Sequence, residues 1–151
     1  MEVLLTFDVV EAIRQHGEAE YPDECCGFLI GAEPDQRQGP TRTVVRTVPA
    51  INTVEAERRR RFVIPPEELR RVEELLEPLN LVVVGFYHSH PDHPARPSSF
   101  DRDHAWPWYT YLVLEVRKGK ARRLGAFNLE PQTQAFEEVP WRTPLDVAAC
   151  Q

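Results

Sequence analysis

Leu81-Val82-Val83-Val84-Gly85-Phe86-Tyr87-His88-Ser89-His90 is the stretch of this chain that bears most directly on its fold and its chemistry. Residues 81–87 are almost all β-branched or aromatic, which is typical of a strand buried on both faces within an α/β sheet. In an extended chain, residues two apart point to the same side, roughly 6.5 to 7 Å apart. The stretch therefore predicts a central strand that presents His88 and His90 together at its exit.

The two imidazoles are candidate metal ligands, because zinc binds histidine nitrogens at about 2.0–2.1 Å. Two histidines and one carboxylate leave a zinc ion with an open fourth position, which is typical of catalytic sites. A histidine pair at a strand end is also common as a solvated or hydrogen-bonded surface pair. Asp92, His93, Asp103 and His104 lie in the same stretch, and their spacing does not exclude them as ligands.

A helix-entry signature follows the two histidines. Pro91, Pro94 and Pro97 favour an extended loop without regular strand pairing. Ser98 then has the character of an N-cap, with Asp101 in the first turn of a short helix. A carboxylate at this position is well placed to face a cation in the adjacent loop, so Asp101 is a candidate third ligand.

His88-x-His90, seven residues, Ser98, two residues and Asp101 match the pattern H-x-H-x7-S-x2-D without a gap. This pattern is the motif of the JAMM (MPN+) metalloproteases. Over residues 7–128 the chain resembles the short stand-alone members of that family from prokaryotes. The motif is specific, because it fixes four residue types at three spacings.

Residues 21–31, Tyr-Pro-Asp-Glu-Cys-Cys-Gly-Phe-Leu-Ile-Gly, resemble the first core segment of the same family, where the catalytic glutamate lies. The resemblance places this glutamate at Glu24. From the residues alone the choice stays open, because Glu18, Glu20 and Glu33 are nearby. An acidic residue just before a strand is usually a solvated turn residue.

The resemblance implies a zinc peptidase, with one zinc ion per chain bound by His88, His90 and Asp101. A water molecule takes the fourth position, and zinc can lower the pKa of water from 15.7 to about 7. Glu24 is then similar to the general base of the family. Ser98 matches the serine that stabilises the oxyanion on the attacked carbonyl.

The resemblance also implies a class of substrate. JAMM enzymes hydrolyse amide bonds after the Gly-Gly tail of ubiquitin or ubiquitin-like proteins, and the short prokaryotic members act on sulfur-carrier proteins of the same β-grasp fold. Two alternatives stay open: a zinc amidase or endopeptidase acting on another peptide, and a non-catalytic MPN-type binding module. A zinc deaminase is not expected, because the chain has no Cys-x-x-Cys.

The composition is that of an ordinary globular domain of 151 residues. The net charge of −6 gives no reason to expect nucleic acid as a partner. No apolar run approaches the roughly 20 residues of a membrane span, so no membrane partner is expected. Three cysteines make no disulfide framework, and the adjacent Cys25 and Cys26 are expected as small buried thiols. We therefore expect a cytoplasmic protein, and a homodimer is an open alternative to a monomer.

Strands that alternate with helices predict an α/β fold, with a mixed sheet flanked by helices on both faces. The family resemblance implies the same JAMM/MPN architecture, similar to the cytidine deaminase fold. We expect one domain over residues 1–140 and a C-terminal tail over 141–151, from which Trp141 could pack back. The expected strands are 25–31, 41–49, 58–64, 81–87, 109–116, 121–129 and 133–139.

Two helices are expected between these strands, at residues 8–17 and 65–78. The buried stripe expected on the first comprises Phe7, Val10 and Ile13, and that on the second Leu69, Val72, Leu75, Leu76 and Leu79. Val44, Val45 and Val48 are the candidates for burial in the second strand.

Four consecutive arginines, Arg58 to Arg61, stand out in an acidic chain. Such a run is usually a solvated strand edge. A sharper hypothesis is a docking patch for an acidic partner, or for the C-terminal carboxylate of a tail that enters the cleft.

Overall fold

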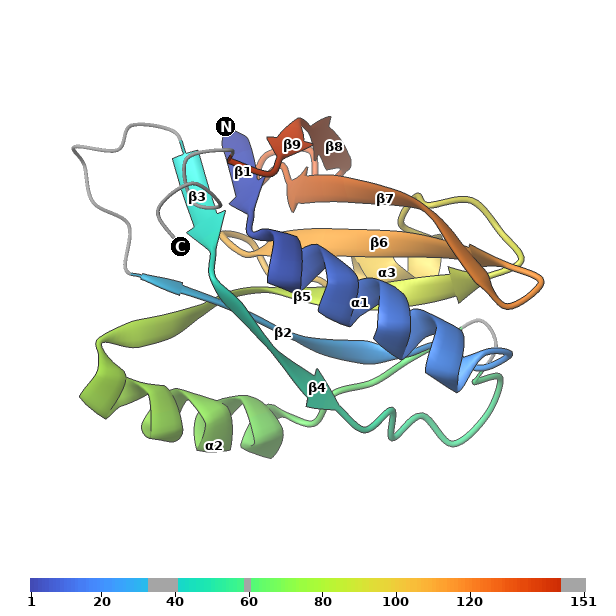
Figure 1. Cartoon of the computed structure of the whole chain (residues 1–151), viewed down its shortest axis with the longest axis horizontal. Coiled ribbons are helices and arrows are strands. Elements are labelled where there is room, and N and C mark those ends of the chain that lie inside the picture. The colour runs from blue at the N-terminus through green and yellow to red at the C-terminus, as the bar shows by residue number, and fades with distance from the viewer. Residues whose placement is uncertain (33–40, 59–60, 145–151) are drawn as a thin grey trace.

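A computed structural model describes residues 1–32, 41–58 and 61–144 of the chain. Its main sheet has six strands in the order β4-β2-β5-β6-β7-β8, with β5 and β6 parallel and the other neighbours antiparallel (Figure 1). The strands are β2 (Cys26–Ala32), β4 (Arg46–Ala50), β5 (Leu81–Pro91), β6 (Thr110–Arg117), β7 (Lys120–Leu129) and β8 (Phe136–Val139). The mixed α/β sheet expected from the sequence is confirmed.

A second, smaller sheet has three parallel strands in the order β3-β1-β9. Its strands are β1 (Glu2–Leu5), β3 (Thr41–Val44) and β9 (Trp141–Arg142). Trp141 packs against the core and its indole nitrogen donates to the Leu124 carbonyl at 2.7 Å, so this side chain does pack back. Strands β1 and β9 were not predicted from the sequence.

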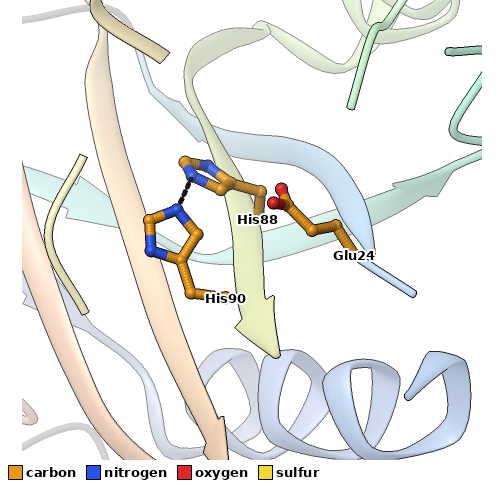
Figure 2. Close-up of side chains that lie close together, drawn as sticks. All are labelled: Glu24, His88 and His90. Atoms are coloured by element: carbon orange, nitrogen blue, oxygen red, sulfur yellow. Dashed lines mark hydrogen bonds between the residues drawn. The ribbon is translucent and has the colours of Figure 1, made fainter. Parts of the chain in front are cut away.

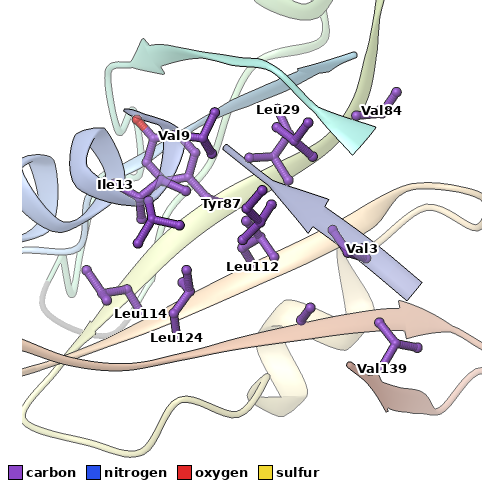
Figure 3. Close-up of a cluster of buried hydrophobic side chains, with 14 of the residues drawn as sticks. Val3, Val9, Ile13, Leu29, Val84, Tyr87, Leu112, Leu114, Leu124 and Val139 are labelled. Carbon is purple, nitrogen blue, oxygen red and sulfur yellow. The ribbon is translucent and has the colours of Figure 1, made fainter. Parts of the chain in front are cut away.

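Two longer helices cover opposite faces of the main sheet (Figure 1). They are α1 (Phe7–Glu20) and α2 (Pro66–Leu76), the latter followed by a 3-10 turn, η2 (Glu77–Leu79). Val9 and Ile13 of α1 pack with Tyr87 and Leu112 of the sheet (Figure 3). On the other face, α2 packs against a second cluster that contains Phe28, Phe86 and Tyr111.

Several local expectations were wrong. Residues 41–49 form two strands in different sheets, because β3 leaves the main sheet to pair with β1. The described part of 58–64 has no strand. Four side chains expected to be buried are exposed: Phe7 (64%), Val45 (40%), Leu75 (63%) and Leu79 (56%). The helical stripes are thus narrower than the apolar pattern suggested.

The central position of β5 determines where the site lies. This strand pairs with β2 on one side and β6 on the other, and it extends to Pro91, so His88 and His90 are still inside the sheet. Gly85 permits the close approach of β6, because a Cβ at this position would lie 1.9 Å from the Thr110 carbonyl oxygen. Among the described residues, no helix is long and apolar enough to cross a membrane.

Candidate active site

Three polar side chains meet beside the end of β5. The Nε2 atoms of His88 and His90 are 3.1 Å apart, and Oδ2 of Asp101 lies 3.0 and 3.1 Å from them. All three residues are buried. The two rings come from the same face of β5, as the strand periodicity predicts, and point toward each other (Figure 2).

Asp101 reaches this position from the short helix α3 (Ser99–Asp103), which begins with a capping box. Ser98 Oγ accepts from the Asp101 amide at 3.1 Å, and the Ser98 amide donates to Asp101 Oδ2 at 2.8 Å. Burial by itself would raise the pKa of Asp101. The charges and hydrogen bonds of His88 and His90 outweigh burial and hold that pKa well below its usual range.

Glu24 lies beside His88, in the segment that leads into β2 (Figure 2). It is 1% exposed, and neither carboxyl oxygen has a hydrogen-bond partner among the described residues. Burial raises the pKa of Glu24 to about 9, with a further contribution from the charge of Asp101. A buried carboxyl group without a partner is costly, so its position calls for a ligand or a chemical role.

The donor set fits a zinc ion. Glu24, His88 and His90 each offer a ligand atom, and these atoms all lie within 4.8 Å of one another. Asp101 adds a carboxylate oxygen at hydrogen-bond distance from both rings. Neighbouring ligand atoms of a tetrahedral zinc ion with bonds of about 2.0–2.1 Å are about 3.3 Å apart. The Nε2 atoms of His88 and His90 and Oδ2 of Asp101 have nearly this spacing, at 3.0–3.1 Å. The other nitrogen of His90, Nδ1, lies 2.8 Å from the Pro94 carbonyl, an outer hydrogen bond typical of metal-binding histidines.

The other candidate ligands from the same stretch are engaged in contacts outside the cluster. Asp92 is exposed and bonds to Tyr21 and to the Lys118 amide. Nδ1 of His93 forms a hydrogen bond with the Pro91 carbonyl, and Nδ1 of His104 forms one with the Phe100 carbonyl. The exposed Asp103 forms an ion pair with its neighbour Arg102.

The adjacent cysteines, Cys25 and Cys26, are buried free thiols, as expected from the sequence. Burial raises the pKa of both thiols, which opposes formation of the thiolate that a metal would bind.

Residues 7–127 match the family described as prokaryotic homologs of the JAB domain. The chain belongs to this family. The match confirms the JAMM-type resemblance and covers both the Glu24 segment and the His88–Asp101 motif of this JAB domain.

Named relatives extend this finding. The JAB domain is 37% identical to a desampylase of Haloferax volcanii over 106 residues, 70% of this chain and 71% of the relative. It is 33% identical to a CysO-cysteine peptidase of Mycobacterium tuberculosis over 129 residues, 84% of this chain and 82% of the relative. The solution structure of a protein from Desulfitobacterium hafniense is similar, with a TM-score of 0.79 and 27% identity, covering 95% and 93% of the two chains.

Some neighbours of the site in this JAB domain were not predicted. The ring of Phe62 stacks on His88 at 4.5 Å between centroids, and that of His93 stacks on His90 at 4.0 Å. Ser89, which points away from His88 and His90, accepts a hydrogen bond from the Cys25 amide at 2.8 Å. The alternation of side chains along the strand predicted the direction of Ser89, whereas its partner is a contact between distant segments.

Two cavities flank the cluster. One, of about 390 Å³, has His88 and Asp101 in its wall and is otherwise rich in aromatic rings; we call it the aromatic cavity. Its rings are those of Phe62, Phe86, Phe100, Trp106 and Tyr111. The other, of about 270 Å³, contains Glu24; we call it the Glu24 cavity. The aromatic cavity meets the cluster at His88 and Asp101, and the more polar Glu24 cavity meets it at Glu24.

Proposed function

We propose that this JAB domain is a zinc metallopeptidase that hydrolyses the amide bond after the C-terminal Gly-Gly of a ubiquitin-like or sulfur-carrier protein. The observation that carries the proposal is the contact of His88, His90 and Asp101 at 3.0–3.1 Å, beside an unpartnered and buried Glu24. Two nitrogens, one carboxylate and a nearby second carboxyl group are the parts that a zinc hydrolase needs.

The two carboxyl groups differ in a way that divides their roles. Asp101 contacts both imidazoles and its pKa is lowered, so it stays ionised and suits a metal ligand. Glu24 touches neither ring by a hydrogen bond in the described structure, and burial raises its pKa to about 9. A carboxyl group with a raised pKa can hold and transfer a proton near neutral pH. A cation bound at the cluster would lower the pKa of Glu24 again, because its charge favours the ionised carboxylate.

Zinc bound by His88, His90 and Asp101 would supply a Lewis acid that lowers the pKa of water and polarises a carbonyl group. Glu24 accepts the proton of the attacking water and later donates it to the leaving amine. The Ser98 oxygen accepts from the Asp101 amide, which leaves its hydroxyl proton free to stabilise the developing oxyanion. His88 and His90 are held by stacking on Phe62 and His93.

The substrate class rests on the relatives and on simple geometry. Two of the relatives are a desampylase and a CysO-cysteine peptidase, which supports a peptidase that acts on a small carrier protein. Glycine has no side chain, so a Gly-Gly end lets the scissile carbonyl approach a buried cluster. The strand β4 is an edge of the main sheet, so its free backbone groups allow an extended tail to add to the sheet.

The test is hydrolysis of a β-grasp carrier protein that is extended past Gly-Gly by a short peptide, followed by mass spectrometry. Zinc-loaded protein, chelated protein and Glu24→Gln are compared, with Glu11→Gln on α1 as the matched control. We expect cleavage directly after Gly-Gly that needs zinc and Glu24 but not Glu11. Cleavage only at other sequences would favour an endopeptidase, and zinc binding without any cleavage would favour a binding module. Absence of zinc binding would overturn the proposal.

A further inference from the structure

The wall of the Glu24 cavity contains acidic side chains and an arginine that have no role in the proposed chemistry. Besides the buried Glu24, its wall contains Glu20 from the end of α1, Asp23 from the following turn, and Arg58 from the start of the arginine run. At about 270 Å³, the cavity is below the size of most small-molecule pockets, which begin near 300 Å³. It therefore suits a single residue rather than a longer segment.

The position of Glu24 assigns this cavity to one side of the scissile bond. If Glu24 passes its proton to the leaving nitrogen, the leaving group must lie on the Glu24 side of the cluster. The aromatic cavity has His88 and Asp101 in its wall but not Glu24, so it lies on the acyl side. The Glu24 cavity is thus where the released amine would sit.

Arg58 is held beside Glu24 by the backbone, because its carbonyl accepts from the Glu24 amide at 2.7 Å. Among residues 1–32, 41–58 and 61–144, no carboxylate forms an ion pair with the Arg58 guanidinium. Arg61, from the same run, is engaged: it pairs with Glu57 at 3.2 Å and lies over the ring of Phe100. Of the two arginines of the run that the structure describes, Arg58 is therefore the one in the wall of this cavity without an ion pair.

We propose that Arg58 binds the free α-carboxylate of a single residue that follows the Gly-Gly of the carrier. The inference rests on the proposed function and names its leaving group: one amino acid with a free carboxylate, rather than the side chain of a lysine in another protein. A guanidinium recognises a carboxylate through two parallel hydrogen bonds, so Arg58 would determine specificity without touching the reacting atoms.

The chemistry of the product supports this assignment. Hydrolysis breaks the C–N bond, adds the hydroxyl of water to the acyl carbon and a proton to the nitrogen. A released amino acid is a zwitterion at neutral pH, with an ammonium and a carboxylate on one carbon atom. The carboxylates of Glu20 and Asp23 complement the ammonium, and Arg58 complements the carboxylate. If the leaving group were the side chain of a lysine in another protein, its α-carboxylate would be part of a peptide bond, so Arg58 would have no carboxylate to bind.

The experiment compares two substrates that differ in one group. A β-grasp carrier with Gly-Gly followed by one cysteine is made with a C-terminal carboxylate or with a carboxamide. The zinc-loaded protein should prefer the carboxylate about 10-fold or more in kcat/KM, as expected for a hydrogen bond between charged groups. Arg58→Gln should lose this preference through a raised KM, while its rate on the carboxamide stays unchanged.

Two further variants make the result specific to Arg58. Arg58→Lys keeps the charge but not the planar fork, so it should retain only part of the preference. Arg46→Gln, which removes an exposed arginine from the neighbouring strand β4, should retain all of it. Circular dichroism and zinc stoichiometry check that each variant is folded and loaded.

The possible outcomes separate the two proposals. Equal cleavage of carboxylate and carboxamide, or a preference that survives in Arg58→Gln, would overturn the role of Arg58. Zinc-dependent cleavage after Gly-Gly would then still support the peptidase. No zinc-dependent cleavage of either substrate would overturn both.

Discussion

The Tyr21 hydroxyl donates a hydrogen bond of 2.5 Å to Oδ2 of Asp92 and so joins the two halves of the site. Tyr21 ends α1, three residues before Glu24, and Asp92 follows β5, two residues after His90. The other oxygen of Asp92 accepts from the Lys118 amide at 2.8 Å, which ties the same turn to the β6–β7 hairpin. One carboxylate therefore holds the turn after β5 against the segment that contains Glu24.

This contact predicts that Tyr21→Phe loosens the site without removing any ligand. Outer hydrogen bonds around metal sites typically contribute 10- to 100-fold in affinity or activity, so we expect a loss of about 10-fold in zinc affinity. Tyr109→Phe, at the far end of the sheet, is the control and should change nothing. Competition with a chromogenic chelator measures the affinity, and a Tyr21→Phe value equal to wild type would argue against the linkage.

Asp101→Asn should abolish tight zinc binding while it keeps the shape of the capping box. The side-chain oxygen of asparagine can still accept a hydrogen bond from the Ser98 amide, but asparagine lacks the negative charge that faces His88 and His90. The exposed Asp103→Asn on the same helix is the control. Zinc at 100 times its Kd should stabilise the wild type by about 2.7 kcal/mol. A chelator should therefore lower the Tm of wild type and Asp103→Asn, but not that of Asp101→Asn.

The raised pKa of Glu24 predicts how the stability of the zinc-free protein changes with pH. Its carboxyl pKa is about 9 in the fold and near 4.5 when unfolded, so the folded state keeps a proton that the unfolded state loses. The contribution of Glu24 is complete below pH 4.5 and declines as pH rises toward 9, by at most about 1.4 kcal/mol per pH unit. Glu24→Gln should remove this decline.

Urea unfolding of the chelated wild type and of Glu24→Gln, between pH 5.5 and 8.5, measures the difference. The variant should become progressively more stable than the wild type as pH increases. Parallel curves for the two proteins would mean that Glu24 is solvated and has an ordinary pKa.

Ser98 has a structural role and a proposed catalytic one, which different substitutions separate. Ser98→Ala removes the cap of α3, at about 0.5–2 kcal/mol, and the proposed oxyanion donor, at about 100- to 1000-fold in kcat. Ser98→Thr keeps both a capping oxygen and a hydroxyl donor and should retain most of the activity. If Ser98→Ala loses stability but not kcat, the serine is only a cap.

Gly85 predicts a purely structural effect. A Cβ at this position would lie 1.9 Å from the Thr110 carbonyl oxygen of β6, and backbone cannot move aside as a side chain can. Gly85→Ala should therefore destabilise the pairing of β5 with β6 by about 3 kcal/mol or more, at the upper end for single substitutions. Thermal unfolding checks this, with Ala126→Gly as a comparison that removes a methyl group instead. An unchanged Tm for Gly85→Ala would contradict the close approach.

The candidate site could be predicted from the sequence because most of its parts are local. His88 and His90 share one face of a strand by simple alternation, and Ser98 and Asp101 form a capping box within four residues. The choice of Asp101 over Asp92, His93, Asp103 and His104 came from a family resemblance. Only the distances show that Asp101 reaches both imidazoles.

The errors have a common physical cause. Leu75 and Leu79 continue an apolar stripe in the sequence, but both are exposed, whereas Val72 and Leu76 of the same segment are buried. The run 41–49 contains enough β-branched residues for one strand, but β1 competes for its first half. Strand pairing and burial depend on which segments are available nearby, and a local pattern does not contain that information.

The sequence by itself determined the periodic elements, the α/β class and the local metal motif, because these depend on residues a few positions apart. The tertiary structure decided the rest: the burial of Glu24 beside two histidines, the link from Tyr21 to Asp92, and the place of Arg58 in the wall of a polar cavity. Each of these arises between segments about 30 to 70 residues apart. Desolvation and charge act through space, so they appear only when the chain has folded.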